Sequence, residues 1–88
     1  MKVVKLHPHN TAWKQGFSHA LRFNSWDKQA EKAEDILAKM YNTPCYDRKG
    51  PYYAHFGRPR KHILEQKPYW INLKNEADIT LILLNGVL

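Results

Sequence analysis

The chain has 88 residues, of which 43% are hydrophobic and 12% aromatic, enough for one packed domain spanning residues 1–88. Fourteen lysine and arginine residues against eight aspartate and glutamate residues give a net charge of +6. No apolar run approaches the roughly 20 residues of a membrane-spanning helix, the apolar start is too short for a signal peptide, and the single cysteine, Cys45, excludes an intramolecular disulfide. We therefore expect a cytoplasmic protein without a membrane partner, in which Cys45 is a small turn or core residue.

The N-terminal part predicts a strand that runs directly into a helix. Residues 1–16 form either an extra strand or a loose N-terminal arm. Phe17, Leu21 and Phe23 then lie on one side of a predicted strand over residues 17–23, because alternate residues of a strand share a face.

A helix is predicted over residues 25–41, because apolar residues recur there at steps of three and four. Ser25 is a suitable N-cap, and Asp27 complements the positive start of the helix. The expected inner face consists of Trp26, Ala30, Ala33, Leu37 and Met40. The acidic residues of the opposite face are expected to contact solvent: Glu31, Glu34 and Asp35.

Two more strands and a second helix complete the predicted elements. Aromatic residues indicate a strand over residues 51–56, and an alternating pattern indicates another over residues 69–74. For the last apolar segment we favour a helix over residues 76–85 to a buried strand over residues 79–84, because Asn75 is a good N-cap. Asp78 would occupy the capping-box position, and the expected inner face consists of Ala77, Leu81, Leu83 and Leu84.

The order strand, helix, strand, strand, helix predicts an α+β fold, a small antiparallel sheet with two helices on one face. It resembles the split β-α-β plait, the ferredoxin-like arrangement. A sheet of this kind leaves its other face open.

Much of the positive charge lies between residues 48 and 74, where seven cationic residues are interleaved with five aromatic ones. Cations neutralise phosphates and aromatic rings stack on bases, so this pattern is typical of nucleic-acid binding. If the two aromatic strands are neighbours, alternate rings emerge on the open face of the sheet. The candidate residues for binding nucleic acid or another partner are Arg48, Lys49, Tyr52, Tyr53, Arg58, Arg60, Lys61, Lys67 and Trp70.

Catalysis is not expected. His7 and His9 can share a cation, but a metal site needs further ligands at fixed geometry, and the sequence identifies none. The pair resembles the metal-binding histidines of single-strand nucleases and transposases, in which a tyrosine, here Tyr41, would be the nucleophile. This sequence departs from that pattern at Pro8, because those enzymes have a bulky hydrophobic residue between the two histidines. The sequence shows no glycine-rich phosphate-binding loop, no Ser/His/Asp arrangement typical of a catalytic triad and no pair of inward-facing carboxylates. We therefore predict no cofactor and no metal.

The sequence therefore predicts a small non-catalytic binding module that contacts DNA or RNA through a cationic, aromatic face. The alternative is an accessory or inhibitor protein, of the kind that phages and mobile elements encode. Such a protein would bind an acidic surface of a host protein or of a protein–nucleic acid complex. An open sheet face or an unpaired edge strand also allows a homodimer.

Overall fold

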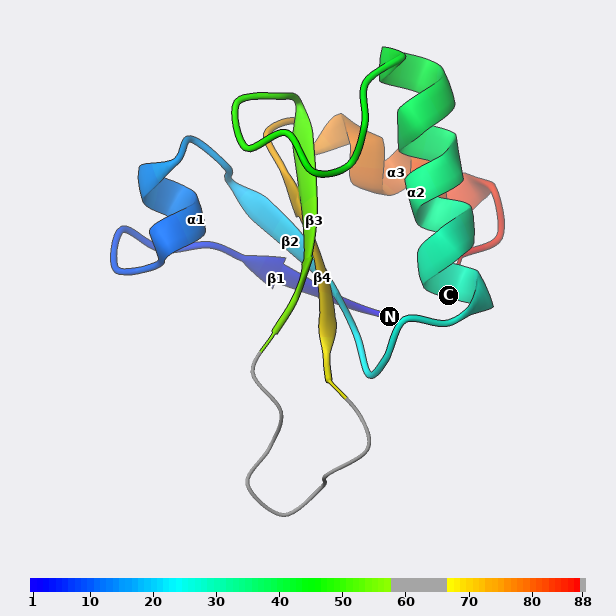
Figure 1. The fold of residues 1–88 in the computed structure, drawn as a ribbon, viewed down its shortest axis with the longest axis horizontal. Coiled ribbons are helices and arrows are strands. Elements are labelled where there is room, and N and C mark those ends of the chain that lie inside the picture. The colour runs from blue at the N-terminus through cyan, green and yellow to red at the C-terminus, as the bar shows by residue number, and fades with distance from the viewer. Residues whose placement is uncertain (58–66, 88) are drawn as a thin grey trace.

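A computed structural model describes residues 1–57 and 67–87, which form a four-stranded antiparallel sheet with three helices (Figure 1). The predicted α+β class is confirmed, and residues 1–16 contain an extra strand followed by a short helix. In chain order the elements are β1 (Lys2–Lys5), α1 (Thr11–Lys14), β2 (His19–Phe23), α2 (Lys28–Tyr41), β3 (Tyr52–Phe56), β4 (Tyr69–Leu73) and α3 (Ala77–Leu84).

The strands lie in the order β1-β2-β4-β3, and every neighbouring pair is antiparallel. Since β2 and β3 both pair antiparallel with β4, they run parallel to each other on either side of it. The edge beside β2 is occupied by β1, from the start of the chain. In a split plait that edge belongs to a strand after the second helix, and among the described residues none follows α3. The predicted order of elements is therefore wrong at this edge.

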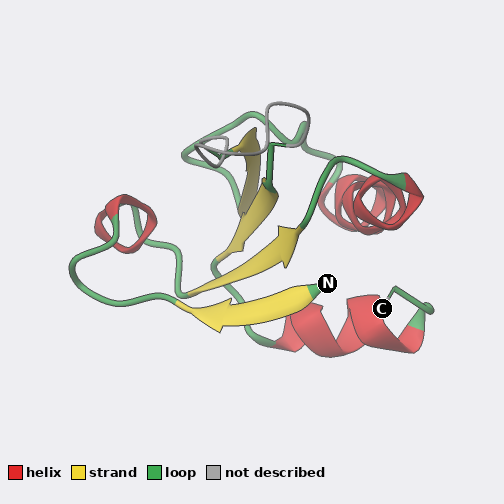
Figure 2. Cartoon of the chain, turned by 90° about the horizontal axis from the view of Figure 1, so that it is seen from below, coloured by secondary structure: helices red, strands yellow, loops and turns green. Residues whose placement is uncertain are grey.

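Helices α2 and α3 lie on one side of the sheet, as predicted, and the short α1 lies on the other (Figure 2). The main core forms between the sheet and these two helices. Its largest completely buried side chains are Tyr52, Leu21, Leu37, Ile71, Leu73, Ile82 and Val87. A smaller cluster of Leu6, Phe17 and Ala20 lies beneath α1. The predicted placement of Phe17 beside Leu21 and Phe23 is wrong, because the regular strand begins only at His19.

Helix α2 starts later than predicted. Its N-cap is Asp27, whose carboxylate accepts a hydrogen bond of 2.9 Å from the backbone N–H of Ala30, so Ser25 is not the cap. Ala30, Ala33 and Leu37 are buried as expected, whereas Trp26 and Met40 are 47% and 41% exposed. The explanation is that Trp26 precedes the helix and Met40 lies in its last turn, beyond the sheet-facing stripe.

The outer face of α2 is also less uniform than predicted. Glu31 and Asp35 are exposed, but Glu34 is only partly exposed and accepts a hydrogen bond from the hydroxyl of Tyr69 in β4. A carboxylate expected in solvent therefore joins the helix to the sheet. Sequence periodicity does not reveal such a contact, because it depends on the partner strand.

The helix α3 over Ala77–Leu84 confirms the favoured prediction for the last apolar segment, and Gly86 takes the left-handed φ of 85° just after it. The predicted N-cap Asn75 is one residue too early, because the N-cap is Glu76, although Asn75 Oδ1 accepts from the N–H of Ala77. The predicted inner face of α3 is wrong. The buried residues are Asp78, Ile79 and Ile82, whereas Leu81, Leu83 and Leu84 are exposed. Asp78 accepts a 2.5 Å hydrogen bond from the hydroxyl of Tyr41 in α2, which turns this face of α3 inward instead of capping the helix. Within the described parts of the chain, no helix is long and apolar enough to span a bilayer.

Candidate functional site

The sheet face opposite α2 and α3 carries a row of four polar and aromatic side chains. Lys2 of β1 is paired with Arg22 of β2, Arg22 with Trp70 of β4, and Trp70 with His55 of β3. Directly paired residues of antiparallel strands project from the same face. Lys2, Arg22, Trp70 and His55 therefore form one line across all four strands, which we call the cross-strand row.

A second line lies beside it, at the end of the sheet that α1 covers. Val4 is paired with Ala20, Ala20 with Asn72, and Asn72 with Tyr53. Leu6, Phe17 and Ala20 pack together here, with Val4, Ala12, Tyr53 and Trp70 against them. Helix α1 therefore covers part of the sheet face that the sequence predicted to be open.

Cations lie over the aromatic rings of this face. The guanidinium carbon of Arg22 is 5.9 Å from the centroid of the Trp70 ring. That of Arg48 is 5.5 Å from the centroid of Tyr53, and Arg48 Nε donates a 3.3 Å hydrogen bond to the Tyr53 hydroxyl. The rings of Tyr53 and His55 stack at 5.4 Å with an interplanar angle of 21°. The face thus combines fixed positive charge with flat surfaces on which planar groups can stack.

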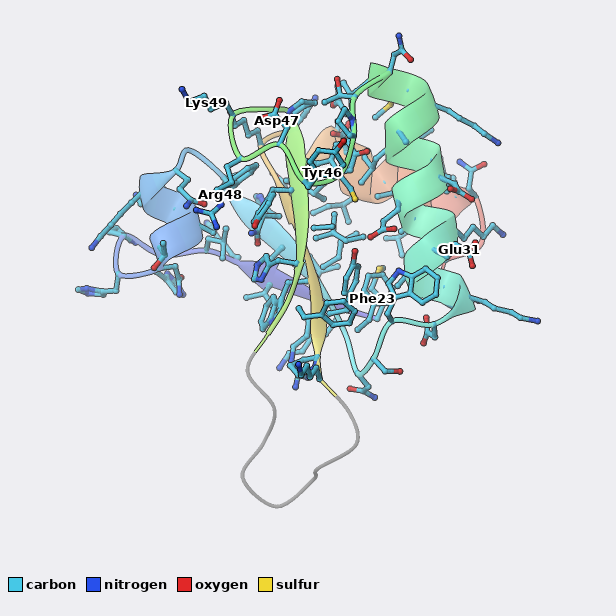
Figure 3. The ribbon with its side chains drawn as sticks, viewed as in Figure 1. Phe23, Glu31, Tyr46, Asp47, Arg48 and Lys49 are labelled. Carbon is cyan, nitrogen blue, oxygen red and sulfur yellow. The ribbon has the colours of Figure 1, made fainter. Side chains whose placement is uncertain are left out.

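A pocket of about 490 Å³ lies between α1 and this face. Asn10, Thr11, Ala12 and Gln15 line it from α1 and its flanks, and Tyr53, His55, Trp70 and Asn72 line it from the sheet. Arg48 also lines it, and Figure 3 shows this side chain extending from its loop toward α1. No acidic residue is among the described lining residues. The pocket can therefore accept a neutral or anionic group.

Acidic residues are concentrated on the other side of the molecule. In residues 1–57 and 67–87, every acidic residue except Asp47 belongs to α2, α3 or the residue that precedes one of them. Glu31, for example, projects outward from α2 (Figure 3). The two sides of the sheet consequently differ in charge, and the open side is the positive one.

The structure places some predicted site residues on this face and others elsewhere. Tyr53 and Trp70 are on it, and Arg48 covers Tyr53. Tyr52 is fully buried on the helix side, where its hydroxyl donates to the carbonyl of Thr43, so it cannot contribute to the open face. Lys49 is exposed and is not among the residues that line the pocket.

The remaining predicted residues lie outside the cluster or outside the described chain. Lys67 is exposed, two residues before β4. Arg58, Arg60 and Lys61 lie outside the described residues.

Three residues of the cross-strand row were absent from the predicted site: Lys2, Arg22 and His55. Arg22 had a usable signal, because it sits between the core residues Leu21 and Phe23 and must face the other way. His55 had the same signal within the predicted strand 51–56. The sequence contained no such signal for Lys2. Its place in the row depends on the register between β1 and β2, which no local sequence pattern specifies.

The helix side holds a group of protonated side chains. Burial, and then the contact with Glu34, raises the pKa of Tyr69. Burial also raises the pKa of Tyr52 to about 12, and burial followed by nearby Glu34 raises the pKa of Cys45. Cys45 is free and partly buried against the main core, as predicted. Because its thiol form is favoured, this cysteine is a poor nucleophile.

Neither a metal centre nor a known relative points to a function. Within the part of the chain that the structure describes, no three His, Cys, Asp or Glu side chains are grouped as metal ligands, and both His7 and His9 are exposed. Comparisons of the chain with protein families, with curated proteins and with solved structures found no match. The functional conclusion therefore depends on the geometry and charge of the open face.

Proposed function

We propose that this chain is a non-catalytic module that binds single-stranded nucleic acid across the open face of its sheet. The observation that supports this most strongly is the cross-strand row, in which Lys2, Arg22, Trp70 and His55 are in direct register. Cations placed on one face release counterions from a phosphate backbone, and a ring beside them stacks on a base. Among the described residues, all acidic side chains except Asp47 belong to the helix side, which limits repulsion between the open face and a polyanion.

A single strand fits this face better than a duplex. Neighbouring strands of a sheet are about 4.8 Å apart, so the row spans roughly 14 Å and one chain can contact all four residues. The exposed parts of Trp70 and Tyr53 require bases that are not already stacked inside a helix. Arg22 and Arg48 lie over these two rings, and a guanidinium plane can itself stack on a base.

We also propose that the fold is a variant of the ferredoxin-like plait. Helix α2 connects β2 to the parallel strand β3, with β4 between them, and α3 follows β4 on the same face. Strand β1 takes the edge that a C-terminal strand would hold in the plait. Plait-type folds that bind single strands use the face opposite their helices, which is the face proposed here.

The test is a binding titration with matched double variants. Fluorescence anisotropy with labelled single-stranded DNA, single-stranded RNA and duplex DNA is measured for the wild type and for Arg22→Ala/Trp70→Ala. The control is Lys28→Ala/Trp26→Ala, which removes one cation and one exposed tryptophan from the helix side. We expect the first variant to lose roughly a hundredfold in affinity for a single strand, and the control to bind as the wild type does.

Equal losses in both variants would contradict the proposal, because they would show that binding does not depend on the open face in particular. Failure of the wild type to bind any of the three nucleic acids at low salt would also contradict it.

A protein partner is the second candidate, and the exposed leucines of α3 favour it. Leu84 is 79% exposed, Leu83 45% and Leu81 37%, and contiguous apolar patches of this kind mark interaction surfaces. This candidate predicts one stoichiometric protein partner that survives nuclease treatment and is lost in Leu83→Ser/Leu84→Ser. Retention of the partner by this variant would exclude the α3 surface.

A further inference from the structure

We infer that the pocket between α1 and the sheet binds one nucleoside monophosphate unit of the strand, with adenine preferred to guanine. This inference rests on the proposed function and adds to it a base-reading site. It is centred on the second line of the open face, where Asn72 and Tyr53 are paired, and it shares the lining residues Trp70 and His55 with the cross-strand row.

The pocket has the size and composition of a site for a small planar ligand. Its volume of about 490 Å³ lies within the range of roughly 300–1,000 Å³ that is common for ligand pockets. Ala12 and Leu6 form apolar wall, and Tyr53 and Trp70 supply aromatic surface. A base that enters this space exchanges stacking in water for stacking on protein rings.

Asn72 is the most buried of the polar residues described as lining the pocket. This residue is only 3% exposed, and it lines the pocket from the inner strand β4, where it is paired with Ala20 of β2 on one side and Tyr53 of β3 on the other. A buried polar side chain that faces a cavity is well placed to bond a ligand. Gln15 contributes a second carboxamide from the opposite wall.

Carboxamides favour adenine. Each offers a donor beside an acceptor, which matches the paired donor and acceptor on an adenine edge. Guanine presents neighbouring N–H donors that a carboxylate accepts best, and the described lining residues include no aspartate or glutamate. The guanidinium that would otherwise select guanine belongs to Arg48, which already lies over Tyr53 and donates to its hydroxyl.

Arg48 has a different role in this arrangement. It is exposed and reaches the pocket from the loop before β3, so its outward N–H groups can bind the phosphate attached to the bound base. One residue thus neutralises the phosphate while Asn72 contacts the base. This division predicts that base and phosphate both contribute to affinity.

Calorimetric titrations with AMP, GMP and ribose 5-phosphate test the inference. We expect AMP to bind about tenfold more tightly than GMP, in line with one well-placed bidentate contact, and ribose 5-phosphate to bind more weakly than either. Asn72→Leu should remove the difference between AMP and GMP. Because Asn72 is buried, a second variant is needed: Thr11→Phe fills the pocket from an exposed position, and His9→Phe is its control outside the pocket.

A single-stranded oligonucleotide titrated in parallel separates this inference from the proposed function. If the oligonucleotide binds but AMP and ribose 5-phosphate bind equally, or if Thr11→Phe binds AMP as the wild type does, the base-reading pocket is wrong and the strand-binding face stands. If AMP binds but the oligonucleotide does not, the proposed function is wrong, and so is the claim that the base belongs to a strand. If nothing binds, both are wrong.

Discussion

Arg22 lies over the ring of Trp70, with its guanidinium carbon 5.9 Å from the ring centroid, because the two residues are directly paired across β2 and β4. Both are only partly exposed, and the two side chains are in contact without any ligand. A charged group and a flat ring held together in this way need little ordering on binding. The pair therefore forms the centre of the cross-strand row, and several measurable consequences depend on it.

The salt dependence of strand binding should decrease when one cation of the face is removed. Arg22→Gln is expected to reduce the slope of log affinity against log salt concentration by about 0.7, the value for one phosphate contact on a single strand. Lys39→Gln removes an exposed cation from α2 and serves as the control. An unchanged slope for Arg22→Gln would show that Arg22 contacts no phosphate.

Gly57→Ala should weaken binding, although residue 57 has no side chain to offer a ligand. A Cβ atom at this position would be 2.7 Å from Trp70 Nε1 and 2.9 Å from Pro68 Cγ, so the indole must move. We expect a lower affinity with an unchanged salt slope, and a destabilisation of about 1–3 kcal/mol from overpacking. Anisotropy titrations and urea unfolding measure the two effects, and wild-type affinity would show that the position of Trp70 is irrelevant.

The start of α2 can be tested with two alanine substitutions. Asp27→Ala removes the carboxylate that accepts from the Ala30 N–H and should lower the free energy of unfolding by about 0.5–2 kcal/mol. Ser25→Ala should have almost no effect, since Ser25 is not the N-cap. Urea denaturation of both variants at neutral pH distinguishes the two caps, and the reverse order would place the helix start at Ser25.

Stability should fall at alkaline pH because of Tyr41. Burial and the hydrogen bond to Asp78 raise the pKa of Tyr41 to about 12 in the folded state, against about 10 in the unfolded chain. The folded state therefore keeps a proton that the unfolded state loses, so this contribution is complete below pH of about 10 and disappears as the pH rises toward about 12. The raised pKa of Tyr52 acts in the same direction.

Tyr41→Phe isolates this contribution. The variant should be less stable at neutral pH by about 1–3 kcal/mol, because the largely buried Asp78 carboxylate loses its donor, and its stability should fall less steeply above pH of about 10. The control is Tyr46→Phe, which alters a tyrosine that is 75% exposed and should keep the alkaline fall. Urea unfolding across this pH range provides the measurement, and identical slopes for Tyr41→Phe and the wild type would contradict the assignment.

The sequence predicted those features that depend on local periodicity. Ala30, Ala33 and Leu37 follow the helical repeat and are buried, and the alternation within residues 69–74 indicated β4. Helix α1 has only four residues, too few for a periodic pattern, so it was not predicted. The orientation of α3 was mispredicted because the contact between Asp78 and Tyr41 joins two helices that are distant in the chain.

The candidate site was predictable in composition but not in arrangement. Tyr53 and Trp70 were selected from an aromatic, cationic segment, and both are on the open face. Tyr52 was selected from the same segment, yet strand alternation places it in the core. Lys2 and Arg22 reach the site only through the pairing of β1, β2 and β4, which is a property of the folded sheet.

The unequal charge of the two sides of the sheet has a kinetic consequence. The acidic residues of α2 and α3 lie opposite the cations of the open face, so the described part of the chain has an electric dipole across the sheet. An approaching polyanion would turn the domain so that Lys2 and Arg22 meet it first, which raises the share of encounters that begin in a productive orientation. Salt should therefore slow association far more than it accelerates dissociation.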